Sequence, residues 1–164
     1  MTEPALEMEY WFSACEAAEF AAEVEKQGNA LYRRLAGELA GGPVRDMFLF
    51  FAQQEDEHQR IFRGIADHFR GLTVAYAYSV DIAAMLHASL QAIVTVFANQ
   101  DSRPPAGGSV ATCLDLARRI EETSVKVYGH MRLTYTERFS EVLGKIVAEE
   151  EKHLRMVNQT LARL

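Results

Sequence analysis

Apolar side chains recur every three or four positions along most of this 164-residue chain, a spacing typical of amphipathic helices. The strict alternation of a half-buried strand is not the dominant pattern anywhere between the breaks. Glycine and proline interrupt the helical pattern at 41–45 and at 102–109. We therefore expect an all-α protein with four long helices, which run from about 8 to 40, from Pro43 to about 70, from Ser109 onward, and from about 137 to 163.

The lengths of the connections predict how these helices are arranged. Short turns within 8–70 and within 108–163 make each segment an antiparallel helical hairpin. The 37 residues of 72–108 are far more than a turn between two helices needs. They must return along a helix roughly 39 Å long or pack elsewhere, and we expect a fifth helix at about 80–99. The prediction is a single domain, 1–164, built as a four-helix bundle with a long crossover.

A glutamate interrupts each inward-facing apolar stripe near its middle. The four are Glu25, Glu55, Glu121 and Glu150. A buried carboxylate without a partner destabilises the fold by several kcal/mol, and no lysine or arginine clearly shares these stripes. Two divalent cations would balance the four negative charges, with imidazoles as neutral ligands. The pattern therefore predicts a buried site for two metal ions.

The two hairpins repeat one motif. In the first, "EKQGNALY" (Glu25–Tyr32) precedes "EDEH" (Glu55–His58), and in the second, "EETSVKVY" (Glu121–Tyr128) precedes "EEKH" (Glu150–His153). A single Glu-x-x-His is a weak signal, because such pairs also occur on solvated helix faces. Two of them in register with two Glu-x6-Tyr motifs, all on apolar stripes, favour a metal site with a pseudo-two-fold axis. The acids that flank the motifs lie off the stripes, and we expect them to be solvated or to attract metal ions weakly: Asp56, Glu57, Glu149 and Glu151.

Composition and charge exclude several other classes. The net charge of −6 argues against the basic surface that nucleic-acid binding requires. The two cysteines lack the paired spacing of a thiolate metal module, and the N-terminus lacks the pattern of a signal peptide. The most apolar stretch, 82–98, is interrupted by polar residues and is too short for a membrane span. We expect a cytoplasmic protein without a membrane span.

The stretch 82–98 is apolar on more than one helical face, which is typical of a helix buried on both sides. One side would cover the bundle, and the other would form the interface of a homodimer. Packing within a single chain is the alternative.

At the two repeated motifs the sequence resembles the rubrerythrin-like branch of the ferritin-like di-iron carboxylate proteins. The resemblance covers 8–70 and 108–163 and implies a ferritin-like four-helix bundle. It implies that one iron has Glu25 and His58 as terminal ligands and that the other has Glu121 and His153. Glu55 and Glu150 would bridge the two ions.

The resemblance also assigns Tyr32 and Tyr128 as groups whose hydroxyls bind the ligand carboxylates. Rubrerythrins carry an iron–sulfur domain with four cysteines at the C-terminus, and this sequence ends at Leu164 without one. They also place a further glutamate one turn after the first on the third helix, where this chain has Ser124. We therefore expect any electron donor to be a separate molecule.

These features predict a protein with two iron ions, manganese being possible, that reacts with O2 or H2O2 as an oxidase or peroxidase. The residues expected to take part in that chemistry are Glu55, Glu150, Tyr32 and Tyr128. One alternative is a ferroxidase linked to iron storage or delivery. Another is a non-catalytic interaction module stabilised by metal.

Overall fold

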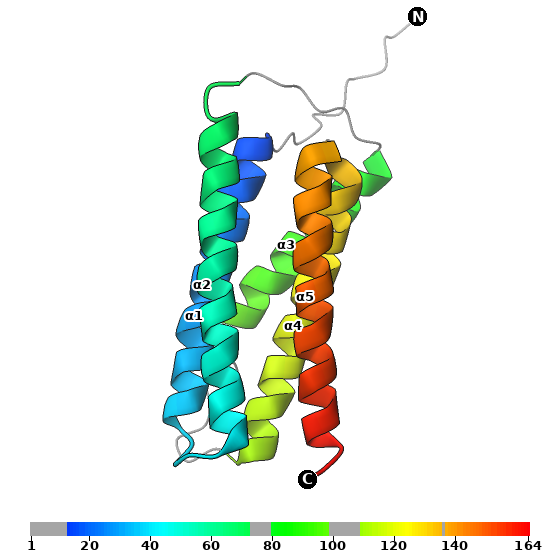
Figure 1. Ribbon diagram of the computed structural model, residues 1–164. Coiled ribbons are helices and arrows are strands. Elements are labelled where there is room, and N and C mark those ends of the chain that lie inside the picture. Colours follow the sequence, from blue (N-terminus) through cyan, green and yellow to red (C-terminus); the bar gives the residue numbers. More distant parts are fainter. Residues whose placement is uncertain (1–12, 73–79, 99–108, 136) are drawn as a thin grey trace, which may run out of the picture.

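Five helices make up nearly all of the described chain (Figure 1). The computed structural model describes residues 13–72, 80–98, 109–135 and 137–164. The helices are α1 (Ala14–Gly37), α2 (Pro43–Phe69), α3 (Val80–Ala98), α4 (Val110–Thr134) and α5 (Glu137–Leu161). The described residues contain no strand, so the predicted all-α class is confirmed. Residues 8–12 and 99, which the sequence placed in helices, lie outside the described residues.

Local chemistry explains where three of the helices begin. Ser13 and Glu16 form a reciprocal capping box at the start of α1. The hydroxyl of Ser109 accepts a hydrogen bond from the backbone N–H of Thr112, as expected of an N-cap at the start of α4. Pro43 occupies the first turn of α2 after Gly42, whose φ of 97° is a conformation that favours glycine.

The helices form two hairpins with a crossing helix between them. In Figure 1, α1 and α2 lie side by side, α4 and α5 form the second pair, and α3 crosses obliquely behind them. Ile93 of α3 is fully buried in the same apolar cluster as residues of α1 and α4. The crossover predicted within 72–108 therefore contains the expected helix. None of the described helices combines the length and apolar character needed to cross a bilayer.

The core has two apolar halves with a polar layer between them. One half contains Phe62, Met131, Phe139 and Leu143. The other contains Leu31, Phe48, Leu114 and Val157. Along every long helix, the glutamate of the stripe lies between residues of the first half and residues of the second. The bundle therefore encloses the four carboxylates between two water-excluding layers.

Candidate metal centre

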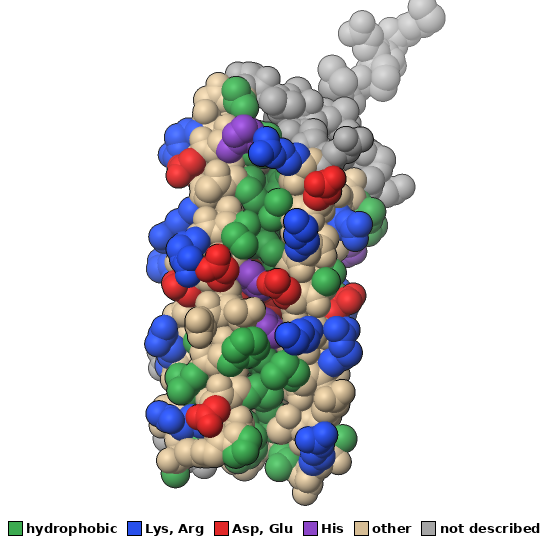
Figure 2. Space-filling view, viewed as in Figure 1, with side chains coloured by type: hydrophobic (Ala, Val, Ile, Leu, Met, Phe, Trp, Pro, Cys, Tyr) green, Lys and Arg blue, Asp and Glu red, His purple; other side chains and the backbone are tan. Residues whose placement is uncertain are grey.

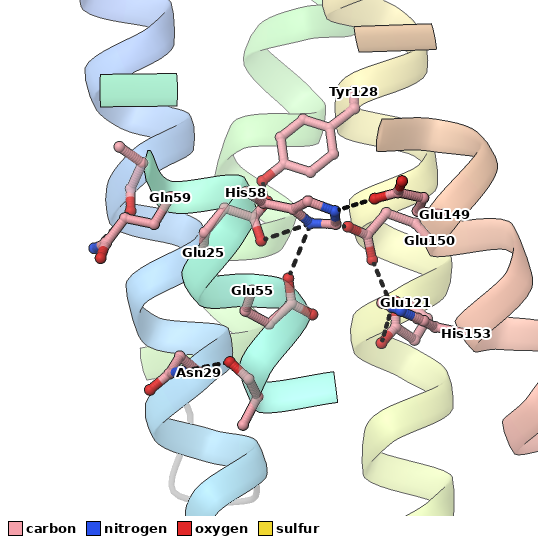
Figure 3. Close-up of polar contacts among 12 residues, drawn as sticks. Glu25, Asn29, Glu55, His58, Gln59, Glu121, Tyr128, Glu149, Glu150 and His153 are labelled. Carbon is pink, nitrogen blue, oxygen red and sulfur yellow. Dashed lines mark hydrogen bonds and ion pairs between the residues drawn. The ribbon is translucent and has the colours of Figure 1, made fainter. Parts of the chain in front are cut away.

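Four helices each contribute buried ligand-type side chains to the middle of the bundle. These are Glu25 from α1, Glu55 and His58 from α2, Glu121 from α4, and Glu150 and His153 from α5. None of the six is more than 4% exposed. A glutamate and a histidine three residues apart lie on one helix face, so both point the same way. Figure 3 shows the labelled carboxylates and imidazoles turned toward one another.

The six side chains form two overlapping groups. One contains Glu25, Glu55, His58 and Glu150, and the other contains Glu55, Glu121, Glu150 and His153. Within each group, one ligand atom per residue lies within 4.8 Å of all the others. Glu55 and Glu150 are common to both groups, and they come from different hairpins. Such sharing is the arrangement that two adjacent ions with bridging carboxylates require.

Both imidazoles present Nδ1 to the carboxylates. Nδ1 of His58 lies 2.9 Å from Glu150, 3.3 Å from Glu55 and 3.6 Å from Glu25. Nδ1 of His153 lies 3.4 Å from Glu150 and 3.7 Å from Glu121. The same ring atom therefore faces the centre in both halves.

Several of these inward atoms are buried and make no hydrogen bond of good geometry, although Nδ1 of His58 lies within 2.9 Å of Glu150. They are Oε2 of Glu55, Nδ1 of His58, Oε2 of Glu121, Oε1 of Glu150 and Nδ1 of His153. Buried polar atoms normally have partners, because leaving one unsatisfied destabilises the folded state. Carboxylate oxygens and imidazole nitrogens are also the donors that divalent transition metals accept. The residues present therefore fit a pair of metal ions.

Burial and mutual repulsion shift the pKa values of these acids. Burial, reinforced by the charge of Glu150, raises the pKa of Glu55 and of Glu121 well above the ordinary value. Burial also opposes ionisation of Glu150, but the imidazoles of His153 and His58 beside it lower its pKa. Burial opposes protonation of His58, and the surrounding carboxylates outweigh it and raise the pKa of the ring. Without metal, the centre must therefore hold protons to reduce its charge.

Two buried tyrosines connect the hairpins through the ligand carboxylates. The hydroxyl of Tyr32 on α1 donates to Glu121 on α4, and the hydroxyl of Tyr128 on α4 donates to Glu25 on α1. Burial and the adjacent carboxylates raise the pKa of both phenols, so both remain protonated donors. Each hydroxyl thus binds a carboxylate of the buried cluster that comes from the other hairpin.

Glu149 makes a contact that the sequence pattern did not predict. We expected this residue to be solvated, and its side chain is indeed 50% exposed. One of its oxygens nevertheless lies 2.6 Å from Nε2 of His58, on the opposite side of the ring from the centre (Figure 3). A carboxylate on the outer nitrogen of a ligand histidine orients the ring and raises its basicity. The available signal was an acid directly before the second Glu-x-x-His.

The other flanking acids behave as expected. Glu57 pairs with Arg60 at 2.6 Å, Asp56 pairs with the same arginine at 3.5 Å, and Glu151 pairs with Arg155 at 3.9 Å. All three carboxylates are about half exposed. Ion pairs at such exposure add little to stability.

Comparisons with known proteins agree with this architecture. The family model described as Rubrerythrin matches residues 16–95. A solved structure described as a ferritin-like diiron-carboxylate protein, from Thermotoga maritima, is 20% identical in sequence, with a TM-score of 0.67. The match covers 93% of this chain and 97% of that one. Among curated proteins, none matches this chain. Residues 16–95 therefore resemble rubrerythrins in sequence, and nearly the whole chain has the ferritin-like fold.

Proposed function

We propose that this protein is a two-metal oxidoreductase that uses iron, or manganese, to react with O2 or H2O2. The observation that carries the proposal is the pair of overlapping Glu/His groups that share Glu55 and Glu150. Five of their inward atoms are buried and lack hydrogen-bond partners, as expected of ligands. Carboxylate and imidazole donors suit iron and manganese.

The proposed ligand assignment follows the two groups. Glu25 and His58 would bind one ion, Glu121 and His153 would bind the other, and Glu55 and Glu150 would lie between the ions. Ions that change between two oxidation states would supply or accept the electrons of the reaction.

The surrounding residues would keep the ligands in place while the charge of the centre changes. Tyr32 and Tyr128 hold Glu121 and Glu25 through donated hydrogen bonds. Buried phenols with raised pKa values would remain protonated and keep donating. The two apolar halves of the core would exclude bulk water from the centre.

Three further statements belong to this proposal. The electron donor would be a separate molecule. The protein would work in the cytoplasm as a single domain, 1–164. It would also form a homodimer through α3, where Met85 and Val94 are exposed apolar side chains.

The decisive experiment is metal analysis of the native protein and of Glu150→Ala, with Glu151→Ala as the control. Glu150 is shared by both groups, whereas its neighbour Glu151 faces solvent. We expect about two iron or manganese ions per chain in the native protein and in the control, and a large loss in Glu150→Ala. Equal, substoichiometric metal in all three proteins after anaerobic loading with Fe(II) would contradict the proposal.

A kinetic experiment separates oxidoreductase chemistry from the alternatives. Protein loaded anaerobically with Fe(II) would be mixed with O2 or H2O2, and oxidation would be followed by absorbance. We expect repeated turnover with an added reductant, and loss of turnover in Glu55→Ala. Oxidised iron that accumulates far beyond two ions per chain would point instead to iron storage. Preferential binding of zinc without oxidation would point to a non-catalytic module.

A further inference from the structure

A groove of about 350 Å³ lies between α2 and α5, outside the ligand set. Its α2 wall includes Ile61, Ile65 and Phe69, and its α5 wall includes Val142. Figure 2 shows a strip of hydrophobic side chains along the seam between these two helices. The volume lies within the range of small-molecule sites, and the apolar walls suit a hydrocarbon chain.

One end of this α2–α5 groove is basic. His68 and Arg138 line it, at the C-terminal end of α2 and the N-terminal end of α5. Among the described residues, no carboxylate pairs with Arg138. Two exposed arginines further along the same helices, Arg60 and Arg155, do have such partners. The groove therefore combines apolar walls with a cation that is available to a ligand.

The opposite end of the groove approaches the candidate metal centre. Ile61 lies three residues after His58, which is roughly 4.5 Å along the axis of α2. On α5, Val142 precedes Glu149 by seven residues, or about two turns. Glu149 is half exposed and contacts the outer nitrogen of His58, so a side chain at this seam connects solvent with the centre. In Figure 2 histidine and carboxylate side chains interrupt the hydrophobic strip midway.

We propose that the α2–α5 groove binds a medium-chain amphiphile with an anionic head, such as a carboxylate. The head would lie against Arg138 and His68, and the apolar chain would extend along Ile65 and Ile61 toward the metal centre. Only one part of this proposal rests on the proposed function, namely that the bound molecule is a substrate of the metal centre. Binding itself requires no metal.

Gly64 provides a way to close the groove without disturbing the core. It lines the groove, and a Cβ added there would meet no atom within 4 Å. Gly64→Leu would therefore place a side chain in the open space that the ligand needs. Gly129 on α4 has equally open surroundings and lies outside the groove, so Gly129→Leu is the matched control.

The test is isothermal titration of the metal-free and metal-loaded protein with hexanoate, octanoate and decanoate. We expect one site per chain, with affinity that rises roughly fourfold for each methylene buried. Gly64→Leu should weaken decanoate binding at least tenfold, and Gly129→Leu should leave it unchanged. Arg138→Gln should weaken decanoate roughly fivefold, as expected of an exposed ion pair, and should not affect decanol.

Equal binding of decanoate to the native protein and to Gly64→Leu would overturn the proposal. Decanol that binds as tightly as decanoate, with no effect of Arg138→Gln, would overturn the assignment of an anionic ligand. Because the metal-free protein is measured too, the experiment distinguishes an error in the groove proposal from an error in the proposed metal centre. If decanoate binds and the protein takes up no metal, the groove proposal is supported and the proposed oxidoreductase function is contradicted.

Discussion

The two halves of the candidate centre have the same ligand types but different surroundings. The first half contains Glu25, Tyr32, Glu55 and His58, and the second contains Glu121, Tyr128, Glu150 and His153. In both halves, Nδ1 of the histidine faces the carboxylates, and the tyrosine donates to the terminal glutamate of the other half. The internal repeat therefore preserves the groups that face the centre.

The halves differ in what contacts each histidine ring on the side that faces away from the centre. Nε2 of His58 contacts Glu149, the residue directly before Glu150. The matching position before Glu55 is Gln54, and in the described part of the chain Gln54 makes no hydrogen bond to His153. The ring of His153 instead packs against Phe51, with ring centroids 4.4 Å apart. One imidazole therefore has a charged support and the other has an aromatic one.

The halves also differ beside the shared carboxylates. Gly28 lies one turn after Glu25, and a Cβ at this position would lie 3.4 Å from Cγ of Glu55. The matching position after Glu121 is Ser124, a buried side chain. Glu55 thus lies against bare backbone on α1. The repeated side chains therefore have different surroundings in the two halves of the centre.

The largest expected effect concerns pH, because it acts on both halves together. In the metal-free protein, the folded-state pKa values of Glu55 and Glu121 lie above the ordinary value of 4.5. The folded state therefore binds more protons than the unfolded state above that pH, and stability falls as pH rises. His58, with its raised pKa, contributes in the same direction above its ordinary value of 6.5. Glu150, with its lowered pKa, contributes stability that is lost as pH falls.

We therefore expect the melting temperature of the metal-free protein to fall between about pH 5 and about pH 8. Stabilisation by added metal should grow over the same interval, because the ligands must release their protons. Glu55→Gln and Glu121→Gln should each make the melting temperature of the metal-free protein depend less on pH, since each removes one acid with a raised pKa. Equal flattening would mean that the halves are electrostatically alike. Parallel profiles with and without metal would contradict the assignment.

Removing the tyrosine hydroxyls is expected to have the next largest effect. Tyr32→Phe and Tyr128→Phe each leave a buried carboxylate oxygen without its donor. We expect each to lower the free energy of unfolding by about 1.5–3 kcal/mol, which denaturant titration would measure. Similar losses would confirm that this pair of contacts is symmetric. An unchanged stability in both variants would show that the hydroxyl contacts are not needed in solution.

The support behind His58 gives a smaller effect that separates the two halves. We expect the native protein to bind two Mn(II) ions with unequal affinity, the tighter at the position that includes His58. Glu149→Gln should weaken that ion roughly 10- to 100-fold, and Gln54→Glu should tighten the other. Anaerobic calorimetric titration would measure both constants. Two ions of equal affinity in the native protein, unchanged in Glu149→Gln, would remove the proposed inequivalence.

The smallest expected effect tests the space beside Glu55. Gly129→Ala should raise the free energy of unfolding by roughly 0.5–1 kcal/mol, because alanine favours the helix and nothing lies within 4 Å of the new Cβ. Gly28→Ala should gain less, since its Cβ must pack against Glu55. Thermal unfolding of both variants would show the difference. A larger gain for Gly28→Ala would mean that the contact with Glu55 is favourable.

Much of the fold followed from local patterns. The helical period of the apolar residues predicted the helices, Pro43 and Ser109 predicted two of their starts, and the length of the crossover predicted α3. The six proposed ligands were recognisable because a glutamate on an apolar stripe conflicts with burial. Glu149 was not recognisable in this way, because an acid off the stripe satisfies every local rule.

By itself, the sequence determined which side chains face the inside of the bundle, because that depends on the helical period of each segment. Only the tertiary structure decided which inward groups meet: the hydroxyl of Tyr32 reaches Glu121, and Glu149 reaches His58, across gaps of 89 and 91 residues. Such contacts depend on how far one helix slides and turns against another. That register is set by the packing of the whole core, and the α2–α5 groove is a product of the same packing.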